Sequence, residues 1–184
     1  MDNEKKELSN APQEEININS MREPYPPIKV MGRNPRYANI LLDSYAGASG
    51  ELTAITTYLY QHHDSERILP EFASLLEDVA KVEMHHLDIL ASLIRLLGGD
   101  CRYYGCDGTL WTAKNVHCLT GDPCSQILAA IQAATNAITQ YRHQVILIDD
   151  CHVRAILERI IRDEECHLAL FKRLLHKHFP SHRS

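Results

Sequence analysis

The sequence has few of the features that suit a protein to nucleic acid, to a membrane or to secretion. Lysine and arginine number 19 against 24 aspartate and glutamate, so the formal net charge is -5 and no basic stripe is present to bind a phosphate backbone. No stretch reaches the roughly eighteen apolar residues of a membrane span. The N-terminal residues are polar and lack the apolar segment of a signal peptide. We therefore expect a cytoplasmic protein with neither nucleic acid nor membrane as a partner.

The sequence also lacks closely spaced cysteine pairs and has few phenylalanine and tryptophan residues. None of the six cysteines forms a Cys-x-x-Cys pair, which argues against a zinc ribbon or a rubredoxin-type iron centre, and free thiols are expected. The loop cysteines either cross-link subunits or are plain thiols. Three phenylalanines and one tryptophan stand against eleven histidines. Because histidine is the commonest metal ligand, this bias is the first indication of function.

Helical periodicity divides the chain into an arm, a bundle and a short tail. Residues 1–30 show no periodicity and are predicted to be an N-terminal tail or arm, and residues 180–184 a C-terminal tail. Between them, residues 31–179 carry four helical patterns. These patterns cover residues 34–63, 65–97, 122–148 and 151–178, with a long connection over residues 99–121. The sequence therefore predicts an all-α four-helix bundle of two hairpins.

The two predicted hairpins repeat one another. The segment 54–58, AITTY, matches 137–141, AITQY, at an offset of 83 residues. The word EMHHL at 83–87 matches EECHL at 164–168 at an offset of 81. Both matches occur in the same order, which indicates two copies of one helical hairpin.

Each hairpin carries one Glu-x-x-His pair, Glu83 with His86 and Glu164 with His167. Residues three apart lie on one face of a helix, so the carboxylate and the imidazole of a pair can reach the same metal ion. Apolar residues extend both faces and place these groups inside the bundle, where a buried carboxylate needs a compensating cation. Two such pairs on equivalent helices predict a dinuclear metal site.

The first helix supplies a further candidate ligand, and the third lacks its counterpart. Glu51 follows the small residues 47–50 and lies on an apolar stripe. The offset of 83 places its equivalent at position 134, which is Ala134, and the third helix contains no glutamate. Tyr58 and Tyr141 lie at equivalent positions beyond these two residues. They either hydrogen-bond a metal-binding carboxylate or are ordinary core tyrosines.

The order Glu, Glu-x-x-His, Glu-x-x-His resembles the ferritin-like superfamily. The words EPYPPIKV, SGELTAI, VEMHHLDIL and RIIRDEECH resemble rubrerythrin-like and manganese-catalase-like proteins of spore-forming bacteria, including spore-coat members. The resemblance implies two manganese or iron ions, with Glu51 and His86 on one, His167 on the other, and Glu83 and Glu164 as bridges. Ala134 departs from the family pattern and puts the second ion in doubt.

Two functions follow from this resemblance. One is a manganese-catalase-like oxidoreductase that acts on hydrogen peroxide, located in the cytoplasm and assembled as a homo-oligomer. The other is a non-catalytic metal-binding or structural protein of the spore coat, which contacts other coat proteins and has a degenerate site. Ala134 discriminates between them, and oxygen evolution from peroxide is the assay.

Overall fold

The computed structural model describes residue 20 and residues 23–182. The predicted tail residues 1–19, 21–22 and 183–184 therefore lie outside the described residues. The α-helices in chain order are α1 (Pro35–Ala46), α2 (Glu51–Ser65), α3 (Pro70–Leu96), α4 (Pro123–Leu147) and α5 (Cys151–His178), with short 3₁₀ helices η1 (Ala113–Asn115) and η2 (Pro180–His182). Over the described range the chain forms no strand beyond one isolated bridge between Tyr104 and Leu110.

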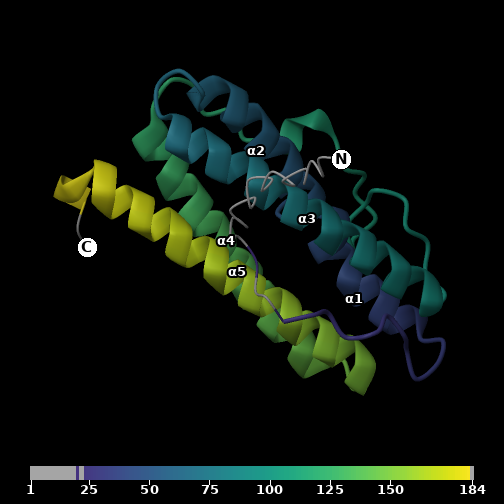
Figure 1. The fold of residues 1–184 in the computed structure, drawn as a ribbon. Helices are drawn as coiled ribbons and strands as arrows, with labels where there is room; N and C mark the ends of the chain where they lie inside the picture. The colour runs from purple at the N-terminus through teal and green to yellow at the C-terminus, as the bar shows by residue number, and fades with distance from the viewer. Residues whose placement is uncertain (1–19, 21–22, 183–184) are drawn as a thin grey trace, which may run out of the picture.

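The helices form two antiparallel hairpins that pack face to face. Figure 1 shows α2 alongside α3 and α4 alongside α5, while α1 packs against the C-terminal half of α3. A connection of residues 97–122 links the hairpins. The predicted all-α bundle of two hairpins with a long connection is confirmed. Within the part of the chain that the structure describes, no helix combines the length and apolarity needed to cross a membrane.

The predicted helix over residues 34–63 is wrong in one respect, because the chain breaks at residues 47–50 into α1 and α2. A Cβ atom on Gly50 would lie 2.6 Å from the carbonyl oxygen of Asp43 and 2.7 Å from that of Ser44. The start of α2 therefore approaches the backbone of α1 so closely that only glycine fits. The break makes Glu51 the first residue of α2.

Other helix boundaries follow the sequence signals. The side chain of Asn34 caps α1 by accepting a hydrogen bond from the Tyr37 backbone, and Pro35 occupies the first helical position, as predicted. Gly98, with a φ of +89°, follows the end of α3 and adopts the left-handed conformation that favours glycine. The second predicted helix begins later than expected, at Pro70 rather than near residue 65.

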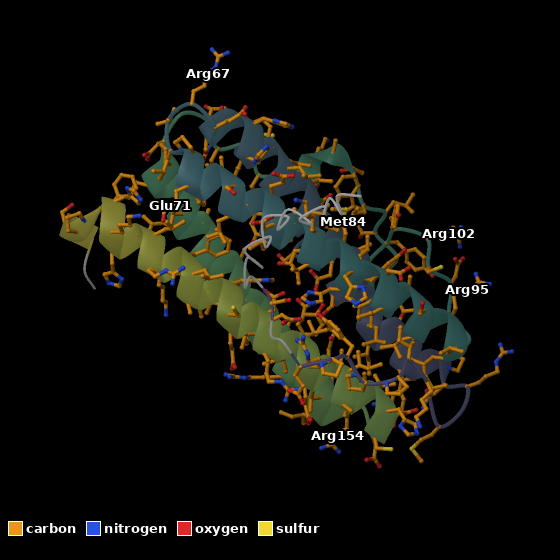
Figure 2. All side chains as sticks on the ribbon, viewed as in Figure 1. Arg67, Glu71, Met84, Arg95, Arg102 and Arg154 are labelled. Atoms are coloured by element: carbon orange, nitrogen blue, oxygen red, sulfur yellow. The ribbon has the colours of Figure 1, made fainter. Side chains whose placement is uncertain are left out.

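Buried apolar side chains form two clusters along the bundle, with a polar layer between them. Ile89 and Leu90 of α3 belong to one cluster, and Val79 and Ala80 to the other. The residues between them on α3 include Glu83 and His86, both buried. In contrast, the charged side chains labelled in Figure 2, such as Arg67 and Arg154, project from the outside of the bundle. The interior thus holds a charged layer between two apolar clusters.

The extended segment 23–34 runs across the bundle before α1 begins. Arg159 of α5 donates a hydrogen bond from Nε to the carbonyl oxygen of Glu23 at 2.9 Å. The backbone N–H of Met31 donates to Oδ2 of Asp150 at 2.6 Å. These contacts hold the described part of the predicted arm against the start of α5.

Candidate metal centre

The five predicted metal-binding side chains converge in the buried polar layer. Glu51 comes from α2, Glu83 and His86 from α3, and Glu164 and His167 from α5. The most exposed of them, Glu51, is only 5% exposed. One ligand atom each from Glu51, Glu83, His86 and Glu164 lie within 4.8 Å of one another. His167 lies outside this tight group but contacts it through Glu83.

The carboxylate of Glu83 lies between the two imidazoles. Its Oε2 is 2.8 Å from Nδ1 of His86, and its Oε1 is 3.2 Å from Nδ1 of His167. Glu164 also faces both rings, with Oε1 at 3.4 Å from Nδ1 of His86 and Oε2 at 3.7 Å from Nδ1 of His167. Glu51 approaches Nδ1 of His86 at 3.9 Å. Two carboxylates thus span two imidazoles, and the third stands on the side of His86.

The donor atoms of this cluster fit a metal centre. Carboxylate oxygens and imidazole nitrogens suit manganese and iron alike. Neither ring nitrogen of His167 has a hydrogen-bond partner within the described residues, nor has Oε1 of Glu164. A buried polar atom without a partner is costly, so each such atom needs an explanation. Coordination to a metal ion would satisfy Nδ1 of His167, which faces the carboxylates, and Oε1 of Glu164.

Without a metal ion, protons on the imidazoles balance the carboxylates. Burial lowers the pKa of His167, but the charge of Glu83 and the nearby Glu164 outweigh it and raise that pKa to about 10. Neighbouring carboxylates likewise overcome burial at His86 and raise its pKa well above the ordinary value. Burial and the charge of Glu83 raise the pKa of Glu51. A binding metal ion must therefore displace protons from the two rings.

The sequence reasoning missed three residues behind the His86 ring, two of which contact the ring directly. Nε2 of His86 lies 3.2 Å from Oδ2 of Asp163 and 2.9 Å from the hydroxyl of Tyr25. Tyr25 donates a hydrogen bond to Asp163, and Nη1 of Arg159 lies 2.6 Å from the same carboxylate oxygen. A carboxylate behind a metal-binding imidazole fixes the ring orientation and the position of its proton.

A sequence signal existed for part of this network. Arg159 and Asp163 are spaced i, i+4 on the buried stripe of α5, the spacing of a helical ion pair. No comparable signal marks Tyr25, which lies 138 residues away from Asp163 in the chain.

The two candidate tyrosines both border the cluster. The hydroxyl of Tyr141 donates a hydrogen bond to Oε1 of Glu51. The ring of Tyr58 packs on that of Phe171, with centroids 5.9 Å apart. Burial raises the pKa of Tyr58 well above its ordinary value, and the charges of Glu83 and Glu164 raise it further. Both phenols are therefore neutral hydrogen-bond donors beside the carboxylates.

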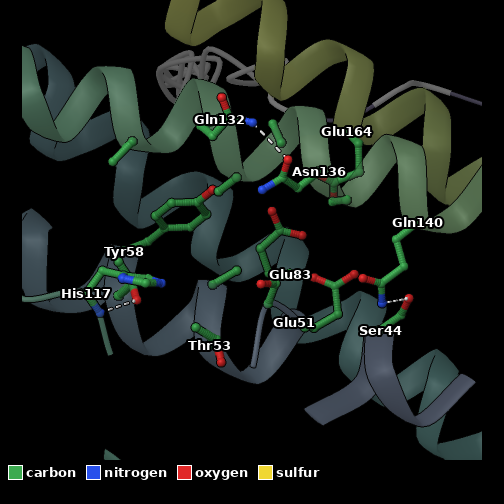
Figure 3. Close-up of a pocket in the computed structure, with 18 of the residues that line it drawn as sticks. Ser44, Glu51, Thr53, Tyr58, Glu83, His117, Gln132, Asn136, Gln140 and Glu164 are labelled. Carbon is green, nitrogen blue, oxygen red and sulfur yellow. Dashed lines mark hydrogen bonds between the residues drawn. The ribbon is translucent and has the colours of Figure 1, made fainter. Parts of the chain in front are cut away.

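A cavity of about 530 Å³ opens onto the cluster between α2, α4 and the connection at residues 116–119. Figure 3 shows Tyr58, Glu83 and Glu51 pointing into it. Ala134 lines the same cavity and is 1% exposed. The position where the repeat places a fourth carboxylate therefore borders empty space.

The bundle shares the fold of bacterioferritins. The BfrA bacterioferritin of Mycobacterium tuberculosis superposes with a TM-score of 0.66 at 21% identity, over 80% of this chain and 88% of that one. The fold and the buried glutamates and histidines thus define a ferritin-like protein.

Sequence comparison narrows this class to one family. The family model described as "Manganese containing catalase" matches residues 23–105. A protein of Clostridium acetobutylicum named "Probable manganese catalase" is 30% identical over an alignment of 172 residues that covers 82% of this chain and 75% of that protein. This chain belongs to the manganese catalase family.

The chain is also similar to a second protein in sequence and to a solved manganese catalase in structure. Protein CotJC of Bacillus subtilis (strain 168) is 28% identical over 160 residues, covering 76% of this chain and 82% of the relative. The solved manganese catalase KatB of Anabaena PCC7120 superposes with a TM-score of 0.77 at 25% identity, over 85% of this chain and 78% of that one.

Proposed function

We propose that this protein binds two manganese ions through Glu51, Glu83, His86, Glu164 and His167 and disproportionates hydrogen peroxide. The observation that carries this function is the position of Glu83, which touches both imidazoles with its two oxygens in a buried layer. The ligand types accept either manganese or iron. Family membership is what favours manganese.

Within this site we assign Glu51 and His86 to one ion, His167 to the other, and Glu83 and Glu164 to both. Manganese bound there would supply the electron exchange by which two molecules of hydrogen peroxide give one of oxygen and two of water. The residues of the chain supply access and proton positions. The cavity gives peroxide a path to the centre, because Glu51, Glu83 and Glu164 line it.

The two tyrosines supply hydrogen-bond donors. Tyr141 keeps Glu51 in place by donating to its Oε1. Tyr58 lines the cavity beside Glu83 and can donate a hydrogen bond to peroxide in the cavity. Asp163 and Tyr25 hold the ring of His86 from behind, so that its Nδ1 stays directed at the carboxylates.

The experiment loads purified protein with Mn²⁺, measures bound metal by elemental analysis and follows oxygen release from peroxide with an electrode. Wild type is compared with Glu83→Gln and with Glu77→Gln, which changes an exposed glutamate on α3 paired with Lys81. The proposal expects metal and oxygen release in wild type and Glu77→Gln only. Oxygen release unchanged by Glu83→Gln would contradict it.

One observation favours a second function, a non-catalytic metal-binding or structural role in the spore coat. Ala134 leaves one half of the site without the carboxylate that the repeat predicts, and Protein CotJC is among the relatives. In that case we propose other coat proteins as partners and the spore coat as the location. Bound manganese without oxygen release would favour this alternative over a cytoplasmic catalase.

We also propose that copies of the chain associate. Ile146 at the end of α4 is 81% exposed, and Leu147 beside it is 40% exposed. Apolar side chains exposed together are typical of a contact surface. Sedimentation analysis of wild type and Ile146→Asp tests this: the variant should dissociate toward monomers.

A further inference from the structure

The cavity beside the metal centre is much larger than hydrogen peroxide requires. Its volume is about 530 Å³, whereas a water molecule in the liquid occupies about 30 Å³. Pockets for organic ligands commonly measure about 300–1,000 Å³. The cavity is therefore large enough for an organic molecule, and the peroxide reaction alone leaves most of it unused.

Four alanines form an apolar part of the α4 wall of this cavity. The alanines 129, 133, 134 and 137 all line it, opposite Glu51, Glu83 and Glu164. These short side chains leave α4 unable to fill the space between itself and α2. The result is an apolar wall on one side of the cavity and three carboxylates on the other.

Amide groups provide hydrogen-bond donors at the rim of the cavity. Nε2 of Gln132 donates to Oδ1 of Asn136 at 2.8 Å, and Nε2 of Gln140 donates to Oγ of Ser44 at 2.8 Å. The first of these bonds orients the Asn136 amide. Its nitrogen points into the cavity in Figure 3, toward the same space as the hydroxyl of Tyr58. Two donors thus face one volume.

The half of the centre that contains His167 has too few ligands. The repeat places a carboxylate at Ala134, where a methyl group stands. Both ring nitrogens of His167 and Oε1 of Glu164 are buried without a hydrogen-bond partner in the described part of the chain. The missing fragment is chemically defined, because a glutamate side chain is an alanine methyl group extended by the heavy atoms of acetate.

We propose that the cavity binds a small aliphatic monocarboxylate whose carboxylate group occupies the place beyond Ala134 and completes the ligands of the ion at His167, a role that rests on the metal binding proposed above. The aliphatic end of the molecule lies along the alanine wall. The amide of Asn136 and the hydroxyl of Tyr58 donate hydrogen bonds to the carboxylate.

The charge of the loaded centre favours such an anion. Glu51, Glu83 and Glu164 contribute three negative charges, and Asp163 is neutralised by Arg159. Two divalent ions exceed the three glutamates by one positive charge when both imidazoles are neutral ligands. One monocarboxylate removes that excess, and a buried centre without net charge is the less costly state.

The test is a Mn²⁺ titration of the metal-free protein, with free ion measured by electron paramagnetic resonance. Samples contain sodium acetate, sodium chloride at equal ionic strength, or acetamide, which has the shape of acetate without its charge. We expect acetate to lower the dissociation constant of the second ion by at least about tenfold. Chloride and acetamide should not lower it.

The same titration is repeated on two variants, one that adds the missing carboxylate and one that serves as a control. Ala134→Glu should bind the second ion without acetate and show no response to acetate. Thr135→Glu, which adds a carboxylate one position away at an exposed residue of α4 that does not line the cavity, should keep the acetate dependence. Because the wild-type titration needs no variant, it decides the matter even where Ala134→Glu does not fold.

The outcomes separate this inference from the proposed function. Two ions bound equally well in acetate and chloride would overturn the carboxylate site and leave the proposed function standing. One ion in every buffer, or equal effects of acetate and acetamide, would also overturn the carboxylate site. No bound manganese under any condition would overturn the proposed function itself, and the carboxylate site with it.

Discussion

Tyr25 lies in the extended segment before α1, outside the helices. Removing its hydroxyl group should destabilise the cluster around His86. This hydroxyl donates to Asp163 and lies 2.9 Å from Nε2 of His86, while the guanidinium carbon of Arg159 lies 4.2 Å from the centroid of the Tyr25 ring. Burial raises the pKa of Tyr25 to about 12, so the group is a neutral donor at physiological pH. Tyr25→Phe deletes the donor and keeps the ring.

The magnitude follows from what remains after the substitution. A hydrogen bond to a charged group contributes about 1.5–3 kcal/mol. Asp163 keeps Arg159 at 2.6 Å and His86 at 3.2 Å, so the carboxylate is not left unpaired. We therefore expect Tyr25→Phe to lower the free energy of unfolding by about 1–2 kcal/mol. Tyr25→Ala should cost about 1 kcal/mol more for the lost contact of the ring with the Arg159 guanidinium alone.

Urea unfolding of the metal-free protein measures these losses, and Tyr104→Phe is the matched control. The Tyr104 hydroxyl donates to the backbone oxygen of Asp100 at 3.2 Å in an exposed position. That control should change the free energy of unfolding by less than about 0.5 kcal/mol. Equal effects of the two substitutions would refute a structural role for the Tyr25 hydroxyl in the centre.

Three further predictions concern the centre and the helix that supplies its first glutamate. Glu83→Gln should abolish most Mn²⁺ binding while Glu77→Gln keeps it, by elemental analysis; equal retention would show that the cluster is not a metal site. Gly50→Ala should destabilise the protein by about 1–3 kcal/mol in urea, because its Cβ would meet the α1 backbone at 2.6 Å. The pKa of His167 rises from 6.5 to about 10 on folding without metal. Its stabilising effect is therefore complete below about pH 6.5 and lost as the pH rises through about 10, so the stability of the metal-free protein should fall over that range in urea titrations.

The sequence alone could predict the five buried glutamates and histidines, because they depend on helical spacing. A Glu-x-x-His pair fixes two side chains on one face of one helix whatever the rest of the chain does. Apolar residues on the same stripe, such as Leu90 and Val79, then require that face to point inward, and the structure buries it. The repeat related the two hairpins and located Ala134.

The break between α1 and α2 could not be predicted in the same way. Small residues at 47–50 are compatible with a continuous helix packed closely against a neighbour. What ends α1 is the approach of Gly50 to the carbonyl oxygens of Asp43 and Ser44, a contact of two backbones within a folded turn. Helical periodicity carries no information on that contact, since the pattern of apolar residues continues on both sides.

The network around Tyr25 shows a second limit of sequence reasoning. Tyr25 contacts Asp163 only because the extended segment before α1 lies across α5. No local preference of a Pro-Tyr-Pro word specifies which helix it will cover. The Arg159 and Asp163 pair was readable as a helical ion pair, but its function depends on the ring of His86 placed next to it by the bundle.

The two halves of the centre are alike in backbone and unequal in chemistry. The half containing His86 has a carboxylate of its own in Glu51, which Tyr141 holds, and its imidazole is supported from behind by Asp163 and Tyr25. The half containing His167 has Ala134 in place of that carboxylate, and Nε2 of its imidazole has no hydrogen-bond partner among the described residues. In the proposed two-metal centre both deficits would weaken the same ion, because a missing ligand and an unsupported ring each lower metal affinity. Ala134 borders the cavity, so space for an external ligand lies where the repeat lacks a carboxylate.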